Sequence, residues 1–182
     1  MTIIGIDPSI NSTGLCVKKD NKIKYYIIPS KMTKKMKEFN NKYIQILPYE
    51  KYDITGQEYV EKEFSKTNNI YNICLIIESL IKKHKPDMII MEGVAYSSNG
   101  SVVDLAGLNY CIRITSMKHN IPFKIVSPTS VKKFAVANGQ ATKDIIIDAW
   151  KKLDKNIRDI RDIKIDDLAD AYFIANYQDL ET

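Results

Sequence analysis

Four acidic residues in this chain have the spacing of a shared site. Asp7 and Glu92 each follow a short apolar run, so each acid ends a predicted buried strand. If these two strands are parallel, both acids emerge at the carboxyl edge of the sheet, where open α/β sheets place their sites. Asp167 and Asp170 are three residues apart and therefore share one face of a predicted C-terminal helix. We expect all four carboxylates to converge if that helix packs across the same edge.

A carboxylate cluster of this kind predicts a divalent metal centre. Like charges within a few ångströms raise one another's pKa, and bound cations relieve this cost. Carboxylate oxygens select Mg²⁺ or Mn²⁺, and two such ions roughly 4 Å apart are the usual apparatus of phosphodiester hydrolysis. A histidine-rich or thiolate site is not expected, because the chain has only two histidines and its three cysteines, Cys16, Cys74 and Cys111, are far apart in the sequence.

Each acid also has a purely structural explanation. An aspartate before proline, as at Asp7, often only terminates a strand. Glu92 can cap a loop. The positive end of a helix dipole favours Asp166, Asp167 and Asp170 whatever their role. The expected convergence of the acids is what favours a site over these separate explanations.

Two predicted helices carry lysines suited to phosphate contact. Lys143 follows Thr142, a predicted N-cap, and the start of a helix is a favourable position for an anion. Lys132 and Lys133 lie on a short helix that follows Pro128. Taken alone, each lysine is better explained as a solvated surface charge.

Hydrophobic patterns predict the elements that position these residues. Short apolar or β-branched runs predict strands over residues 3–6, 13–17, 23–28, 88–91 and 123–126. Apolar stripes and capping signals predict a short helix after residue 127 and longer helices over residues 69–85, 102–114, 143–153 and 166–177. The first three strands are close enough for an antiparallel meander. This order is typical of an α/β protein with a mixed five-stranded sheet flanked by helices.

The segment 29–66 does not fit this pattern. Lysines crowd residues 31–42, and the periodicity of the segment is weak. We interpret it either as an insert packed on one edge of the sheet or as a partly mobile arm. The remainder predicts a single domain over residues 1–182.

Composition and charge exclude several classes of protein. The chain has 182 residues, of which 45% are hydrophobic and 27% charged, so a packed core is expected and general disorder is not. Its apolar runs are too short to span a membrane, and the N-terminus does not read as a secretory signal, so we expect a cytoplasmic protein. A net charge of +5 permits a polyanionic partner without demanding one.

Four short motifs point together to one nuclease family. They are Ile4-Gly5-Ile6-Asp7-Pro8-Ser9 with Thr13-Gly14, Ile89-Ile90-Met91-Glu92, Val131-Lys132 with Lys143, and Asp167-Leu168-Ala169-Asp170-Ala171. In this order they resemble the motifs of RuvC-type Holliday-junction resolvases, members of the RNase H-like superfamily. The first motif is weak alone, but the four together are specific and cover most of the chain.

The resemblance implies an RNase H-like fold and a homodimer that makes paired, metal-dependent cuts in four-way DNA junctions. It implies two Mg²⁺ ions per site held by Asp7, Glu92, Asp167 and Asp170, with Mn²⁺ as a substitute and without a nucleotide cofactor. It also selects Asp167 over Asp166 as the partner of Asp170, which helical spacing leaves open.

The same resemblance implies roles for several other residues. Lys143 would stabilise the charge that builds on the scissile phosphate, and would count among the catalytic residues. Lys132 and Lys133 would bind the DNA backbone. Tyr96 lies one position later than the aromatic wedge of the family, and is a candidate for stacking on a junction base. The insert is closer in style to phage and viral members than to compact bacterial ones, and its lysines would enlarge the DNA footprint.

Other functions compete with this interpretation. The first motif is also similar to the first phosphate loop of actin-like ATPases and sugar kinases, but the chain lacks their second Asp-Gly loop and is too short. An RNase H-type nuclease acting on RNA–DNA hybrid stays open, as does a DNA-binding relative without catalysis, although the presence of all four acids argues against the latter. The helix over residues 102–114 is apolar around much of its girth, so it is either a dimer surface or buried within a monomer.

Overall fold

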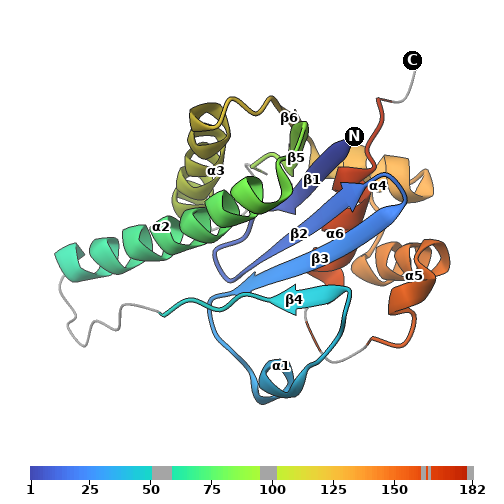
Figure 1. Cartoon of the computed structure of the whole chain (residues 1–182), viewed down its shortest axis with the longest axis horizontal. Coiled ribbons are helices and arrows are strands. Elements are labelled where there is room, and N and C mark those ends of the chain that lie inside the picture. The colour runs from blue at the N-terminus through green and yellow to red at the C-terminus, as the bar shows by residue number, and fades with distance from the viewer. Residues whose placement is uncertain (51–58, 95–101, 161–162, 164, 180–182) are drawn as a thin grey trace.

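The sheet is mixed and has six strands. The computed structural model describes residues 1–50, 59–94, 102–160, 163 and 165–179, and its strand order is β4-β3-β2-β1-β5-β6 (Figure 1). The strands are β1 (Thr2–Asp7), β2 (Ser12–Lys19), β3 (Lys22–Pro29), β4 (Ile44–Ile46), β5 (Met88–Glu92) and β6 (Phe123–Val126). Neighbours β1–β2 and β2–β3 are antiparallel, and the other three pairs are parallel. The mixed sheet is confirmed, and the predicted count of five strands is corrected to six.

Helices cover both faces of the sheet and make three layers. The strand residues alternate between the two faces, as the two-residue repeat of a strand requires. Ile4 and Ile6 face a core that is closed by α2 (Tyr59–His84) and α3 (Val102–Lys118). The opposite core is closed by α4 (Pro128–Val136), α5 (Lys143–Leu153) and α6 (Ile165–Ala175) (Figure 1). Among the residues described, no helix combines the length and apolar character needed to cross a membrane.

Two glycines let α6 lie directly on the sheet. A β-carbon built on Gly5 would meet the backbone of Ala171 and Ala175. One built on Gly14 would overlap the backbone of Asp167. Because the strands present no side chain at these points, the helix backbone approaches β1 and β2 closely. The glycines of the first motif therefore set the position of the helix that carries the last two acids.

The insert contributes an edge strand and extends a helix. After β3, the short helix α1 (Lys34–Glu38) leads to β4, which pairs in parallel with β3. The predicted packing on a sheet edge is thus confirmed for residues 44–46. Helix α2 begins at residue 59, ten residues before the predicted start at 69. Its first turns are largely exposed, and their apolar residues Tyr59, Val60 and Phe64 do not continue the stripe of the core-facing part.

A buried hydrogen-bonded chain holds α5 against the sheet. Trp150 of α5 donates from Nε1 to the Tyr25 hydroxyl of β3 at 2.9 Å. Tyr25 in turn donates to Oδ2 of Asp154 at 2.8 Å. All three side chains are buried, and buried polar groups with partners specify a single packing arrangement. This contact orients α5, whose first residue is Lys143.

Candidate active site

Strand register brings Asp7 and Glu92 to the same level of the sheet. Ile6 of β1 pairs with Met91 of the parallel strand β5, so the next residue on each strand is one of the two acids. Asp7 also stands opposite Gly14 on β2. The backbone of Asp167 rests on that glycine. The first turn of α6 is therefore placed over the carboxyl edge of the sheet, as the sequence predicted.

The acids lie near enough to one another to influence each other's ionisation. Burial raises the pKa of Asp7 well above its ordinary value, and Glu92, Asp170 and Asp167 raise it further by repulsion. Burial and then Asp170 raise the pKa of Glu92 to about 7. Burial also raises the pKa of Asp170. The sheet and the helix thus gather like charges that the protein alone only partly compensates.

Two predicted lysines supply that partial compensation. Lys143 lowers the pKa of both Asp7 and Glu92, and Lys132 lowers that of Glu92. The ammonium of Lys143 lies 2.6 Å from Oδ2 of Asp166. Thr142 is the N-cap residue of α5, but its side chain makes no capping hydrogen bond. Asp166 thus has a role that its sequence position did not reveal, because it holds the lysine expected at the scissile phosphate.

Two further predicted contact residues are Lys133 and Tyr96. Lys133 is exposed on α4, next to Lys132. Tyr96 lies outside the described residues, so its predicted stacking role stays a prediction.

Two polar residues that the sequence analysis passed over support the site. Asn109 of α3 is buried and donates from Nδ2 to the backbone carbonyl of Glu92 at 2.9 Å. The Thr13 hydroxyl donates to the carbonyl of Ser9 at 2.7 Å and accepts from the Ser9 amide at 3.3 Å, closing the turn after Asp7. A polar residue between Leu108 and Tyr110 in the middle of α3 was the available signal for the first contact.

The donor set fits a hard divalent cation. Four carboxylates offer only oxygen atoms, which Mg²⁺ and Mn²⁺ prefer, and positive charge would offset the raised pKa values of Asp7 and Glu92. Within the described ranges, no group of three or more His, Cys, Asp or Glu side chains is arranged to hold a metal ion. The chemistry of the donors therefore fits the predicted class of ion.

Comparisons with known proteins agree on one family. The profile of the family described as "Crossover junction endodeoxyribonuclease RuvC" matches residues 51–176. A protein of that name from Gloeobacter violaceus is 30% identical over 99 residues, which are 54% of this chain and 56% of the relative. Its namesake from Sulfurovum is 25% identical over 177 residues, 96% of this chain and 92% of the relative.

A solved structure supports the same fold. The structure described as "T. thermophilus RuvC in complex with Holliday junction substrate" superposes with a TM-score of 0.62. It is 17% identical in sequence, and the match covers 96% of this chain and 90% of the solved one. At this identity, the likeness shows a shared fold and leaves the chemistry to the residues of the site.

Proposed function

The chain belongs to the RuvC family of crossover junction endodeoxyribonucleases, and from this premise we propose that it cuts four-way DNA junctions. The proposal treats residues 1–182 as one nuclease domain that hydrolyses one phosphodiester bond in each of two opposed strands. The observation that carries it is the meeting of Asp7, Glu92, Asp167 and Asp170 at the carboxyl edge of the sheet, where burial and mutual repulsion raise the pKa of Asp7. A fold kept only for binding has no need of such a costly cluster.

The four acids would hold two Mg²⁺ ions, for which Mn²⁺ would substitute. When bound, the ions would lower the pKa of an attacking water and stabilise the leaving oxygen. In the hydrolysis, the water oxygen forms a bond to phosphorus while the bond from phosphorus to the 3′ oxygen breaks, and that oxygen takes up a proton. The task of Asp7 and Glu92 is to stay ionised as ligands, which their raised pKa values make dependent on nearby cations.

Lysines would supply the remaining positive charge. Lys143 would face the scissile phosphate and stabilise the negative charge that grows there, while Asp166 keeps its ammonium in place through the 2.6 Å contact. Lys132 and Lys133 on α4 would bind the DNA backbone. A charge that interacts mainly with the transition state changes the rate of cleavage. A charge that interacts equally with the bound substrate and the transition state changes the affinity.

A homodimer would present two such sites to the two-fold symmetric junction. Helix α3 offers a surface for it, since Val103, Tyr110, Ile114 and Met117 lie along one helical face and are 61–83% exposed. The opposite face of α3 is core, where Leu108 and Ile112 are fully buried. The two explanations of this helix, interface and core, thus apply to different faces.

The deciding experiment compares three substrates. A synthetic four-way junction, a linear duplex and an RNA–DNA hybrid are incubated with the protein, each with and without Mg²⁺. We expect symmetric nicks in the junction only, and only with the metal. Cleavage of the hybrid in preference to the junction would favour an RNase H-type nuclease, and binding without cleavage would favour a non-catalytic relative.

A further inference from the structure

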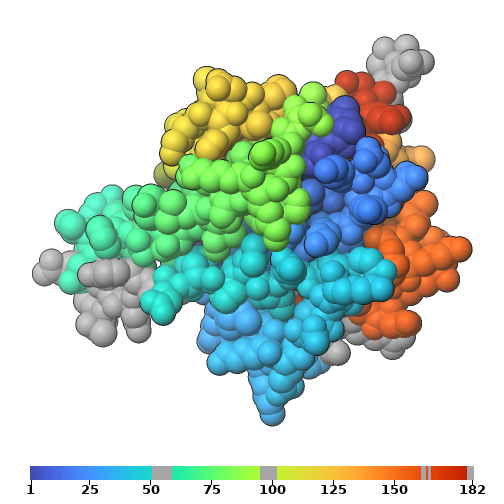
Figure 2. Space-filling model, in the orientation of Figure 1, coloured from blue at the N-terminus to red at the C-terminus, as the bar shows by residue number. Residues whose placement is uncertain are grey.

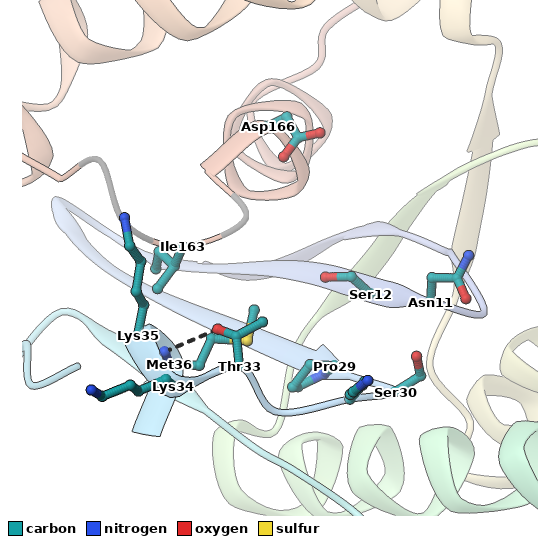
Figure 3. Close-up of a pocket in the computed structure, with 11 residues that line it drawn as sticks. Asn11, Ser12, Pro29, Ser30, Thr33, Lys34, Lys35, Met36, Ile163 and Asp166 are labelled. Carbon is teal, nitrogen blue, oxygen red and sulfur yellow. Dashed lines mark hydrogen bonds between the residues drawn. The ribbon is translucent and has the colours of Figure 1, made fainter. Parts of the chain in front are cut away.

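A cavity of about 830 Å³ lies beside the acidic edge, which is the carboxyl edge of the sheet with Asp7, Glu92 and the first turn of α6. Three segments surround it: the turn from β1 into β2, the lysine-rich segment after β3, and the start of α6 (Figure 3). The lining includes Ser12, which is two residues from Gly14 and hence from the level of Asp7. It also includes Asp166, the neighbour in sequence of Asp167. The cavity is therefore next to the proposed site and is partly built by the insert.

A buried hydroxyl in the lining points to a ligand. Ser12 is 2% exposed, and its Oγ has no hydrogen-bond partner among the residues described. A buried hydroxyl without a partner costs free energy, and native proteins keep few of them. Because Ser12 lines the cavity, a ligand in the cavity can accept the hydrogen bond that its hydroxyl offers (Figure 3).

The charge of the lining favours an anionic ligand. Lys31, Lys34 and Lys35 all line the cavity, and all three are exposed. In the part of the chain that the structure describes, Lys31 and Lys34 form no ion pair with an acidic side chain. The acid in the lining, Asp166, is already matched by Lys143 at 2.6 Å. The cavity thus has an excess of positive charge.

The remaining lining suits the sugars of a nucleic-acid backbone. Pro29, Met36 and Ile163 are buried apolar residues that also line the cavity. An apolar floor beside cations and a hydroxyl matches the alternation of deoxyribose and phosphate along a DNA strand. In Figure 2 the β3–α1 segment projects from the body of the molecule, and its lysines Lys31, Lys34 and Lys35 are exposed.

We propose that this cavity, here called the insert groove, binds the sugar–phosphate backbone of the DNA strand next to the scissile phosphate. Lys31 and Lys34 contact phosphate oxygens, and the Ser12 hydroxyl donates to one of them. The inference rests on the proposed junction-cutting function and assigns part of its substrate to the insert.

Two variants and a matched control test the groove. The double variant Lys31→Ala/Lys34→Ala removes two cations, and Ser12→Ala removes the hydroxyl alone. The control, Lys19→Ala/Lys22→Ala, removes two exposed lysines from the far end of the β2–β3 hairpin. Junction affinity is measured in Ca²⁺ at several salt concentrations, and thermal stability is measured in parallel.

The groove variants are expected to lose affinity without losing the fold. The groove double variant should bind the junction at least about tenfold more weakly, with a salt slope lower by about two, since each phosphate contact contributes nearly one to the slope. Ser12→Ala should bind about fivefold more weakly with an unchanged or higher melting temperature, because it removes an unpaired hydroxyl. The control double variant should stay within about twofold of the natural protein.

Neutralising single phosphates of the DNA tests the groove separately from the proposed junction-cutting function. Phosphates flanking the cut site are replaced one at a time by uncharged methylphosphonates. For the natural protein, at least two replacements should weaken binding, and the same replacements should have no further effect on Lys31→Ala/Lys34→Ala. Equal losses in the groove and control variants would overturn the groove alone. A natural protein that neither binds nor cuts the junction would overturn the proposed function instead.

Discussion

Two glutamates in this fold meet opposite electrostatic surroundings. Glu78 of α2 contacts His119 at 2.9 Å and Lys118 at 3.2 Å, and hydrogen bonds led by that of His119 lower its pKa to about 2. Glu92 lies at the acidic edge, where burial and then Asp170 raise its pKa to about 7. Neighbouring cations compensate the charge of Glu78, whereas Lys132 and Lys143 only partly offset the effects that raise the pKa of Glu92. A compensated acid ties two helices together, and an uncompensated one is suited to bind metal.

The largest difference between the two glutamates should appear in the cleavage rate. Glu92→Gln keeps the size of the side chain but removes a charged ligand, so junction cutting should fall by at least about a thousandfold while binding in Ca²⁺ persists. Glu78→Gln makes the same change outside the site and should leave the rate within about twofold. Single-turnover cleavage of a prebound junction measures both. Comparable rates for the two variants would break the contrast.

Lys143 sharpens the comparison because it partly compensates the acidic edge. Lys143→Ala should lower the single-turnover rate about a hundredfold at saturating enzyme. The variant lacks the positive charge that would stabilise the negative charge developing on the phosphate. Lys132→Ala should mainly weaken binding and lower the salt slope by about one.

The neighbouring acids give a control for the assignment of Lys143. Asp166→Asn should reduce the rate in the same direction as Lys143→Ala, because Asp166 holds the lysine at 2.6 Å. If Asp167→Asn cut normally while Asp166→Asn did not cut, the assigned ligand on α6 would be wrong. A Lys143→Ala protein could instead bind weakly but cut at the full rate once saturated. That result would reverse the roles assigned to Lys143 and Lys132.

The compensated cluster also supports the helix proposed as the dimer surface. Glu78 ties the end of α3 to α2 through Lys118, and the outer face of α3 is left uncovered. Ile114→Glu places a charge on that face, where the natural side chain is 62% exposed, and should weaken dimerisation by at least about tenfold without unfolding the chain. Light scattering measures the mass free and on the junction.

A buried position on the same helix provides the contrast. Leu108 is fully buried, so Leu108→Glu should prevent folding rather than release monomers. A folded, dimeric Ile114→Glu protein would move the interface away from this face of α3.

The smallest expected effect is on stability as a function of pH. The folded pKa of Glu92, about 7, is above its ordinary value of 4.5, so the folded state holds the proton more tightly. Stability from this group is present below about pH 4.5 and is lost as the pH rises towards 7, by about 3 kcal/mol at most. The melting temperature of the natural protein should therefore fall as the pH rises from about 5 to about 7, and that of Glu92→Gln should fall less.

Glu78 should show the reverse pH dependence. Its pKa is lowered to about 2, so its stabilisation is present above pH 4.5 and is lost only as the pH falls towards 2.

Adding Mg²⁺ at pH 8 should raise the melting temperature of the natural protein and have little effect on Glu92→Gln, since a ligand that binds only the folded state stabilises it. An equal response of both proteins to the metal would contradict the assignment of Glu92 as a ligand.

Local signals located the elements of the site but not its details. Apolar runs that stop at Asp7 and Glu92 are strand signals that need no distant contact, and the register between Ile6 and Met91 confirms that the acids are level. The short strand β4 gave no such signal, because its three residues are too few to show a strand pattern. Its pairing with β3 supplies what its own sequence lacks.

Helix α3 shows why periodicity alone was insufficient. Apolar residues surround much of this helix, so no stripe distinguishes Leu108, which is fully buried, from Ile114, which is 62% exposed. Packing against α2 and the sheet decides which side is core. The pairing of Lys143 with Asp166 joins residues 23 positions apart and is likewise invisible to local patterns.

The sequence by itself determined the strand ends that carry two acids and the helical spacing of the other two. These follow from steric and hydrophobic rules that act within a few residues of the chain. Only the tertiary structure decided that Asp166 holds Lys143, that Ser12 and the insert lysines line one groove, and that Glu78 and Glu92 have opposite pKa shifts. Charge and hydrogen bonding depend on distances between segments far apart in the sequence, and folding is what sets those distances.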